Sequence, residues 1–423
     1  MLHTLRPVAS LLVGTALLLA AVGLLNTLVP LRGMEAGFSG TLLGGLTSAY
    51  YAGYLIGTFT MPPLIRRIGH IRAFAFCTAG AACVVLLHAI STWPWMWLLL
   101  RLLAGIVLVG LYAIIESWLN AQAPPQQRGS VFAAYMVVNL GALALSQQLL
   151  RIHGEPFVLF TVVALFTCAA TLPVVLTRQA QPAPQTTPRL QWSRLRRVAP
   201  TAVAGALLSG LAMGAFYGLA PVYAHRIGFD TTRVSLYMTA GILGGAALQW
   251  PLGRWSDRMD RRLTLALVGA AATLLALLAW LAGAHVLPAM ALIFLYGGMA
   301  FAIYPIVVAH LVDYLEPEEL LAASSSVLLI YGAGSALGPL AAGTLMARLG
   351  AGALTVWFAL THLALAAYAG YRYLAFRREQ VTDNNFLPML RTTPAVLEMM
   401  PEAQTPPADT TSPETTEPVP PST

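Results

Sequence analysis

The stretch GLLNTLVPL at Gly23–Leu31 returns later in the chain as GAFYGLAPV at Gly214–Val222, and each copy is followed by a Gly-Phe pair. Five identical or similarly placed pairs share an offset of 191 residues: Gly23 with Gly214, Asn26 with Tyr217, Pro30 with Pro221, Gly37 with Gly228, and Phe38 with Phe229. Self-similarity at a fixed offset is the mark of a repeated structural unit, and five matches make coincidence the weaker interpretation. The repeat predicts two halves with the same fold.

Two further matches extend the repeat. LYAII at 111–115 is paralleled by IYPIV at 303–307, and Tyr135 is paralleled by Tyr331 at a slightly larger offset. Offsets that drift slowly along the chain are expected of a duplication followed by insertions in loops. Two parallel halves of this kind are typical of secondary transporters.

The composition excludes an ordinary soluble protein. Of the 423 residues, 57% are hydrophobic and only 10% are charged, whereas soluble domains average about 25% charged residues. Continuously apolar runs of about 20 residues recur, which is long enough to cross the hydrocarbon core of a bilayer. Such runs are expected to be helices, because their backbone groups find no water there. A barrel is disfavoured, since the runs do not alternate.

The apolar runs predict an all-α polytopic membrane protein with twelve spans in two six-helix bundles. The predicted domains are an N-terminal bundle (1–177), a cytoplasmic linker (178–199), a C-terminal bundle (200–378) and a tail (379–423) whose composition cannot bury a core and predicts disorder. The predicted spans are 8–30, 41–63, 73–91, 95–119, 131–150, 157–177, 200–222, 234–252, 263–283, 288–311, 322–346 and 352–375.

The basic residues predict the orientation. All 24 are arginine. Eighteen fall on the side of the N-terminus, five fall on the other side, and Arg101 lies within a span. The positive-inside rule then places both termini in the cytoplasm, and the chain is expected in the inner membrane as a multi-pass protein. We interpret the net charge of +7 as a topology signal, with no nucleic-acid partner.

Several phrases resemble one family. LNTLVPL, ESWLN, QWPLGRWSDR and GSALGP are similar to phrases of the YcaD-like bacterial branch of the major facilitator superfamily, and the resemblance covers residues 8–377. The resemblance implies twelve helices in two bundles that rock about a central site, and the family default implies proton coupling. In this chain, however, no carboxylate lies at the predicted midplane of the membrane, which weakens the case for a proton relay.

The segment GRWSDRMDRRL at Gly253–Leu263 resembles the loop signature of that family. The matching positions are Gly253, Asp257, Arg258, Arg261 and Arg262. Asp260 stands where the signature has its second glycine, which puts the turn geometry in question. Carboxylates and arginines at helix ends can form charge-assisted pairs, so the resemblance implies a latch that closes the cytoplasmic side. We assign Arg262 to topology alone.

The first half lacks the acidic member of this signature. Its loop reads LIRRIGHIRAF, with Arg66 at the aspartate position. Glu116 lies about 6 Å of helical rise from the end of its span, and it precedes an Arg-Gly pair as the family's latch carboxylate does. The resemblance therefore predicts that Glu116 pairs with Arg67 or Arg72 across the cytoplasmic gate. The alternative is a proton or substrate site, because ionisable residues within spans are functional by default.

Arg101 begins RLLAG, which is similar to the family's R-x-x-x-G signature. It lies about 22 Å from Glu116 by helical rise, in the outer half of the membrane. Its predicted role is to hold an anionic substrate or to perturb a nearby protonatable group. The alternative is an arginine that reaches the outer interface, which Trp93, Trp95 and Trp97 mark.

Other polar residues on apolar spans are candidates for a central cavity. Such residues often only bond between helices. Asn26, Tyr217 and Tyr304 gain weight from their symmetric placement, because the site is expected at the interface between the halves. The full set of cavity candidates is Asn26, Arg101, Tyr112, Asn139, Gln147, Tyr217 and Tyr304.

These observations favour a secondary active transporter of a small amphipathic molecule, neutral or anionic, that works by alternating access as a monomer in the lipid bilayer. Neither the direction nor the substrate follows from the sequence. The alternative is a non-transporting sensor on the same scaffold, which would usually carry a larger soluble domain. No phosphate loop, catalytic triad or metal-ligand spacing is apparent, so neither an enzyme, a cofactor nor a metal is expected.

Overall fold

The computed structural model describes residues 8–123, 127–152, 156–175, 182, 192–315, 319–375 and 392–393. Within these ranges every regular element is a helix. The first half contains α2 (Ala9–Glu35), α3 (Gly40–Ile68), α4 (His70–Ile90), α5 (Pro94–Gln122), α6 (Arg128–Ser146), the 3₁₀ helix η3 (Gln147–Arg151), α7 (Pro156–Ala169) and α8 (Thr171–Val175). The short α9 (Trp192–Val198) precedes α10 (Pro200–Arg226), α11 (Thr231–Asp257), α12 (Arg261–Ala282), α13 (Val286–Val312), α14 (Leu320–Leu349) and α15 (Ala353–Ala375).

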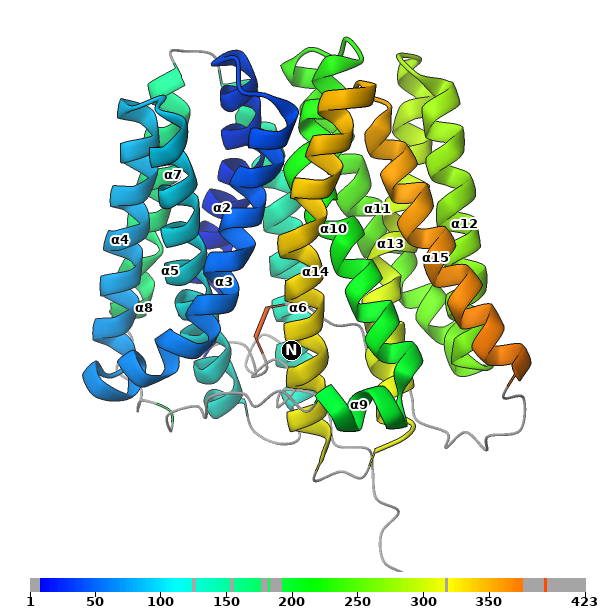
Figure 1. Ribbon diagram of the computed structural model, residues 1–423. Coiled ribbons are helices and arrows are strands. Elements are labelled where there is room, and N and C mark those ends of the chain that lie inside the picture. The colour runs from blue at the N-terminus through cyan, green and yellow to red at the C-terminus, as the bar shows by residue number, and fades with distance from the viewer. Residues whose placement is uncertain are drawn as a thin grey trace, which may run out of the picture.

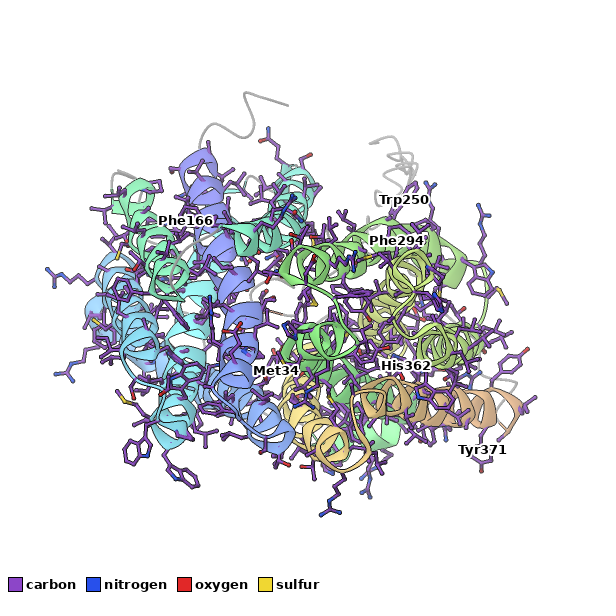
Figure 2. The ribbon with its side chains drawn as sticks, turned by 90° about the horizontal axis from the view of Figure 1, so that it is seen from above. Met34, Phe166, Trp250, Phe294, His362 and Tyr371 are labelled. Atoms are coloured by element: carbon purple, nitrogen blue, oxygen red, sulfur yellow. The ribbon has the colours of Figure 1, made fainter. Side chains whose placement is uncertain are left out.

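The long helices form two bundles side by side, one of α2–α8 and one of α10–α15 (Figure 1). We call the end that carries α9 and the last turn of α15 the linker end. Seen from above, exposed side chains such as Tyr371 point away from the bundles, whereas His362 lies among the helices of the second (Figure 2). Large apolar side chains such as Leu99, Leu281 and Leu374 are exposed on the helices, and such an exterior suits a lipid environment.

The predicted spans agree with the helices. Within the described ranges, ten helical segments are long and apolar enough to cross a membrane, and each coincides with a predicted span. The spans predicted at 41–63 and 234–252 coincide with α3 and α11, which have 29 and 27 residues but are less apolar. For these two helices the transmembrane assignment stays a prediction. The predicted span 157–177 is interrupted, since α7 ends at Ala169 and α8 begins at Thr171.

The internal repeat is visible in the turn that joins the first two helices of each half. Gly37 has a φ of 81° and Gly228 a φ of 99°, a left-handed conformation that glycine adopts without steric cost. Behind each glycine, a phenylalanine N–H returns to a carbonyl five residues earlier: Phe38 to Gly33 at 2.9 Å and Phe229 to Ala224 at 3.1 Å. Both helices thus end in the same hydrogen-bonded cap, which explains the repeated Gly-Phe pair.

The two halves meet closely at the end opposite the linker end, through α3 and α14. A Cβ atom at Gly44 would lie 2.1 Å from the backbone oxygen of Pro339. The backbone N–H of Leu340 also donates to the Ser48 hydroxyl over 3.0 Å. Small residues allow this approach, and it closes the interface on that side. The cavity described next lies between the halves, further toward the linker end.

Candidate substrate cavity and interhelical ion pairs

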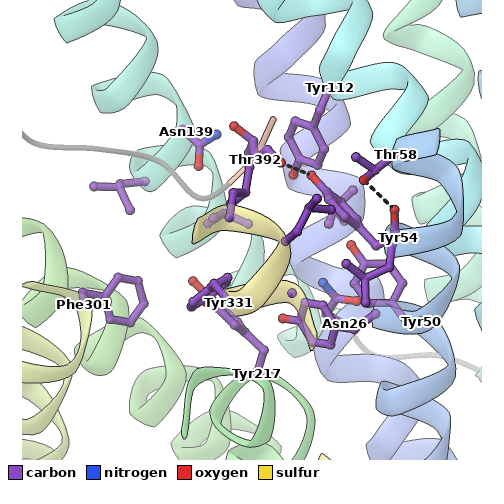
Figure 3. Close-up of a pocket in the computed structure, with 18 of the residues that line it drawn as sticks. Asn26, Tyr50, Tyr54, Thr58, Tyr112, Asn139, Tyr217, Phe301, Tyr331 and Thr392 are labelled. Atoms are coloured by element: carbon purple, nitrogen blue, oxygen red, sulfur yellow. Dashed lines mark hydrogen bonds between the residues drawn. The ribbon is translucent and has the colours of Figure 1, made fainter. Parts of the chain in front are cut away.

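A cavity with about 150 Å³ of free volume lies between the two halves. Tyrosines from several helices converge on it, together with Asn139 and the tail residue Thr392 (Figure 3). The walls come from both bundles, as the repeat predicted for a central site. The lining tyrosines are Tyr50, Tyr51, Tyr54, Tyr112, Tyr217 and Tyr331. Their rings and hydroxyl groups make the wall amphipathic.

Arg101 lies beside this cavity and is only 2% exposed. Its position depends on a close contact between α3 and α5, because a Cβ atom at Gly105 would lie 2.0 Å from the backbone oxygen of Tyr50. This contact brings the Tyr50 ring centroid within 4.5 Å of the guanidinium carbon, a cation–π distance. The glycine of the RLLAG segment thus has a packing role that places the arginine.

The Arg101 guanidinium has spare hydrogen-bonding capacity. Its Nη2 donates to Asn26 Oδ1 over 3.0 Å. Within the described part of the chain, its Nε and Nη1 have no hydrogen-bond partner, and no carboxylate forms an ion pair with it. The adjoining space bordered by Arg101, Asn26, Tyr50 and Tyr217 has no room for a water-sized molecule in this conformation. Buried N–H groups are normally satisfied, so these donors are suited to an anionic group, which can reach them only when the neighbouring side chains move apart.

The structure places the predicted cavity residues as follows. Asn26, Tyr112, Asn139 and Tyr217 line the cavity, and Arg101 borders the space next to it. Two predicted members lie elsewhere. Gln147 holds η3 to α2, since its Nε2 donates to the Gly23 oxygen at 3.1 Å. Tyr304 lies behind the wall, with its ring 4.9 Å from that of Tyr331.

Sequence reasoning missed the tyrosines of α3. Tyr50 and Tyr54 are four residues apart, a spacing that places both on one face of a helix, and their rings lie 6.3 Å apart at the cavity. Tyr54 and Tyr112 are also neighbours. The segment AYYAGY therefore carried a usable signal, because three tyrosines within one span seldom all face lipid.

The predicted pairing of Glu116 with Arg67 or Arg72 is wrong for this conformation. Among the described residues no ion pair joins them, and both arginines are exposed. Glu116 is 0% exposed and accepts a hydrogen bond from the Tyr135 hydroxyl over 2.8 Å. The hydroxyls of Thr392 and Thr393 donate to its two oxygens as well. The carboxylate turns inward toward the cavity, so it does not reach the loop arginines.

The second half holds its ion pairs within its own bundle. Arg261 Nε donates to Asp313 Oδ2 over 2.6 Å, and its Nη1 lies 3.1 Å from Asp257 Oδ1. This arrangement ties the start of α12 to the ends of α13 and α11. Arg258 is exposed, while Gly253 is buried in α11. The expected cluster therefore forms around Arg261, and it joins helices of one half instead of bridging the two halves.

Arg262 is more than a topology signal. It is 2% exposed, and its Nη2 donates to Asp260 Oδ2 over 2.8 Å. Asp260 also caps α12, since its Oδ1 accepts from the Arg262 backbone N–H at 2.8 Å. Burial raises the pKa of Asp260, but the Arg262 hydrogen bonds outweigh it and hold that pKa below its usual range. The turn needs no glycine, because Asp260 has a φ of −56°.

The comparisons with known proteins agree with this architecture. A family model described as the Major Facilitator Superfamily matches residues 11–282 and 204–399. An uncharacterized MFS-type transporter YcaD of Salmonella heidelberg (strain SL476) is 33% identical over 347 residues, which cover 81% of this chain and 89% of the relative. An uncharacterized MFS-type transporter of Enterobacter sp. (strain 638) is 34% identical over 342 residues, with 79% and 87% covered.

Solved structures share the fold at low sequence identity. The crystal structure of the nucleoside transporter NupG has a TM-score of 0.69 at 16% identity, covering 89% of this chain and 100% of NupG. A bacterial homolog of the human lysosomal transporter Spinster, in an inward-facing and occupied conformation, has a TM-score of 0.72 at 14% identity, covering 88% and 96%. At these identities the likeness concerns the fold alone.

Proposed function

This chain belongs to the major facilitator superfamily and is a membrane transporter by family, and we propose from this premise that it moves a small organic anion by alternating access. Arg101 is the proposed binding residue for the anionic group. The tyrosines of the cavity are proposed to contact the apolar or aromatic part of the same molecule. The proposed location is the inner membrane, with both termini in the cytoplasm.

The observation that carries this proposal is the state of the Arg101 side chain. A charged group removed from water is costly unless it is paired and hydrogen-bonded, and an arginine within a span carries a further cost. Asn26 satisfies only one nitrogen, and Tyr50 contributes its ring face. A carboxylate or phosphate could take both free nitrogens in the forked geometry that guanidinium prefers. The alternative, an arginine that reaches the outer interface, fits poorly with a 2% exposed side chain.

The test is ligand-induced thermal stabilisation of the purified full chain by a panel of aromatic carboxylates and their neutral amides. Carboxylates are expected to raise the melting temperature of the wild type, whereas their amides are not. Arg101→Ala should abolish the rise, and Arg101→Lys should keep only part of it, because an ammonium lacks the planar fork. Arg151→Ala is the matched control, since Arg151 is exposed. A panel in which amides and carboxylates act alike would overturn the anion proposal.

We further infer that a proton is the coupling ion and that Glu116 carries it. Asp313 is also a buried carboxylate, but Arg261 balances its charge. Among the described residues Glu116 has no cation as a partner, since its donors are three hydroxyl groups and the Thr393 backbone N–H. A buried carboxylate without a cation is stabilised by taking up a proton. In proteoliposomes loaded with an identified substrate, Glu116→Gln should abolish the response of transport to an imposed pH gradient while leaving exchange in the absence of a gradient.

The direction of transport is tested in cells. Metabolites inside and outside are compared for cells with the wild type, with Arg101→Ala and with empty vector. An anion that moves outward only with the wild type establishes export, and one that moves inward establishes import. Anion binding without any such movement would instead favour the sensor.

A further inference from the structure

Two adjacent residues that follow α15 in the chain lie at the cavity between the two halves. Thr392 lines the cavity together with Tyr54, Tyr112 and Asn139 (Figure 3), and Thr393 is 3% exposed. Both belong to the segment after α15, which ends at Ala375 and is the last helix that the structure describes. The sixteen residues 376–391 can span at most about 55 Å, so chain length does not prevent this placement.

Thr392 and Thr393 form hydrogen bonds with specific groups on α3 and α5. The Thr392 and Thr393 hydroxyls each donate to one oxygen of Glu116. The Tyr54 hydroxyl donates to the backbone oxygen of Thr392 over 2.9 Å. Side chains of α3 and α5 thus bind both the backbone and the side chains of this pair. Such bonds select a segment with two adjacent hydroxyl groups, whereas apolar contact alone would not.

We propose that Thr392–Thr393 is an autoinhibitory ligand of this cavity, held by Glu116 and Tyr54 and released before substrate is bound. Glu116 has no exposed surface, so its oxygens need donors from the protein. Two of its three hydroxyl donors come from this pair, and the third is Tyr135. When the pair leaves, Glu116 loses those donors and becomes available to a proton or to a donor on the substrate.

The space left beside Thr392 supports the inhibitory role. Pockets that bind small molecules usually have volumes of about 300–1,000 Å³, whereas about 150 Å³ remains here. The opposite end is closed by the contact of α3 with α14. A substrate that needs the space or the hydrogen-bonding groups now taken by the threonine pair therefore competes with that pair.

The test measures access to the cavity, and it needs no substrate. Thr58 lines the same cavity, so Thr58→Cys is introduced into the full chain with Cys77, Cys83 and Cys168 replaced by alanine. The probe is N-ethylmaleimide, and the readout is its labelling rate on purified protein. Thr392→Val with Thr393→Val should speed labelling about tenfold or more, because each hydrogen bond lost to a charged group shifts an equilibrium by roughly that factor.

The matched control is Thr410→Val with Thr411→Val, an adjacent threonine pair elsewhere in the same tail, which should leave the rate unchanged. Equal rates for the two double variants would overturn the proposal. A second measurement adds Glu116→Gln to both backgrounds. It should speed labelling in the parent chain and add less than about twofold in the Thr392→Val, Thr393→Val chain, as expected for coupled residues. The same factor in both backgrounds would contradict the proposed bond.

This inference is independent of the substrate class. The labelling rates report only whether the threonine pair occupies the cavity. Anion-dependent stabilisation can therefore fail while the labelling result stands, and the reverse also holds. If both hold, Thr392→Val with Thr393→Val should in addition increase the apparent affinity for the anion about tenfold, because the competing segment is removed.

Discussion

The loops between the second and third helices of the two halves occupy equivalent places but are fastened by different chemistry. Gly69 and His70 in the first half correspond to Asp260 and Arg261 in the second, at the same offset of 191 residues as the first repeat. In both halves the third helix begins directly after this point, at His70 and at Arg261. The positions are the same, so the difference in side chains isolates what charge contributes.

In the first half, the groups that hold this loop in place are neutral. Gly69 has a φ of 81° and a ψ of 162°, a region that is almost restricted to glycine. His70 is 3% exposed, and its Nε2 lies 3.1 Å from the Ser117 hydroxyl oxygen. This hydrogen bond joins α4 to α5.

In the second half, charged side chains hold the equivalent loop in place. Asp260 caps α12 with its own carboxylate, and Arg261 binds the buried Asp313 on α13 over 2.6 Å. The comparison shows that the buried carboxylate of Asp313 forms a structural ion pair, whereas the buried carboxylate of Glu116 has no such partner among the described residues. Asp313 has a permanent cation, whereas Glu116 on α5 shares hydroxyl groups. A carboxylate without such a cation takes up a proton or changes its partner at a lower cost than an ion-paired one.

The largest expected effect is the loss of the buried ion pair. Arg261→Ala should reduce stability by about 3–5 kcal/mol, because it leaves Asp313 buried and uncompensated. The measurement is thermal unfolding of the purified chain in detergent. Asp257→Asn is the control: Asp257 is partly exposed and contacts the same guanidinium at 3.1 Å, so its loss should cost about 1 kcal/mol or less. An equal loss of stability in the two variants would mean that the Arg261–Asp313 ion pair is not the main stabilising contact at this loop.

A smaller effect is expected at the glycine of the first loop. Gly69→Ala should destabilise the chain by about 1–3 kcal/mol, because alanine is strained at this backbone conformation. Gly80→Ala, in the middle of α4, is the matched substitution. A Cβ atom there would meet Val107 at an ordinary 3.6 Å, and alanine favours helix by up to about 1 kcal/mol. The two substitutions should therefore shift the melting temperature in opposite directions.

Much of this comparison could be predicted from sequence, for identifiable reasons. The fixed offset identified Gly37 and Gly228 as equivalent positions, and both end a helix in the structure, because a turn depends on local chain chemistry. Asn26 and Tyr217 were placed at the interface because symmetry required it. The partner of Glu116 could not be predicted, since it depends on where residues 276 positions away lie, and a polar tail has no periodicity that would indicate packing.

Asp260 was misjudged for another reason. Compared with the glycine of the family signature it suggested an altered turn, yet aspartate at the position before a helix is a common cap. Local capping rules would have identified its role, and with it the nearby partner for Arg262. The lesson is that a departure from a family pattern first needs a local physical explanation.

The Asp260 cap should also make the second half sensitive to acid. Its carboxyl has a pKa below the usual value, because the Arg262 hydrogen bonds outweigh the effect of burial. A group with a lowered folded-state pKa stabilises the fold above its unfolded pKa, about 3.9, and that contribution is lost as pH falls through the folded pKa. Asp260→Asn keeps a capping oxygen but loses the ion pair with Arg262, so it should cost about 1 kcal/mol or less at neutral pH and should flatten the decline of the melting temperature between about pH 5 and pH 3. An unchanged decline would assign the acid sensitivity to other carboxylates.

The smallest expected effect concerns the neutral fastening of the first half. Ser117→Ala removes the partner of His70 and should cost about 1 kcal/mol, the usual net value of a hydrogen bond, with up to about 3 kcal/mol if the imidazole stays unsatisfied. Ser209→Ala is the matched control, because Ser209 is 1% exposed and its hydroxyl has no hydrogen-bond partner within the described ranges. Removing an unsatisfied buried hydroxyl should be neutral or stabilising. If Ser117→Ala proved as costly as Arg261→Ala, the contrast between a neutral and an ionic fastening would fail, and the two loops would be equivalent in energy as well as in position.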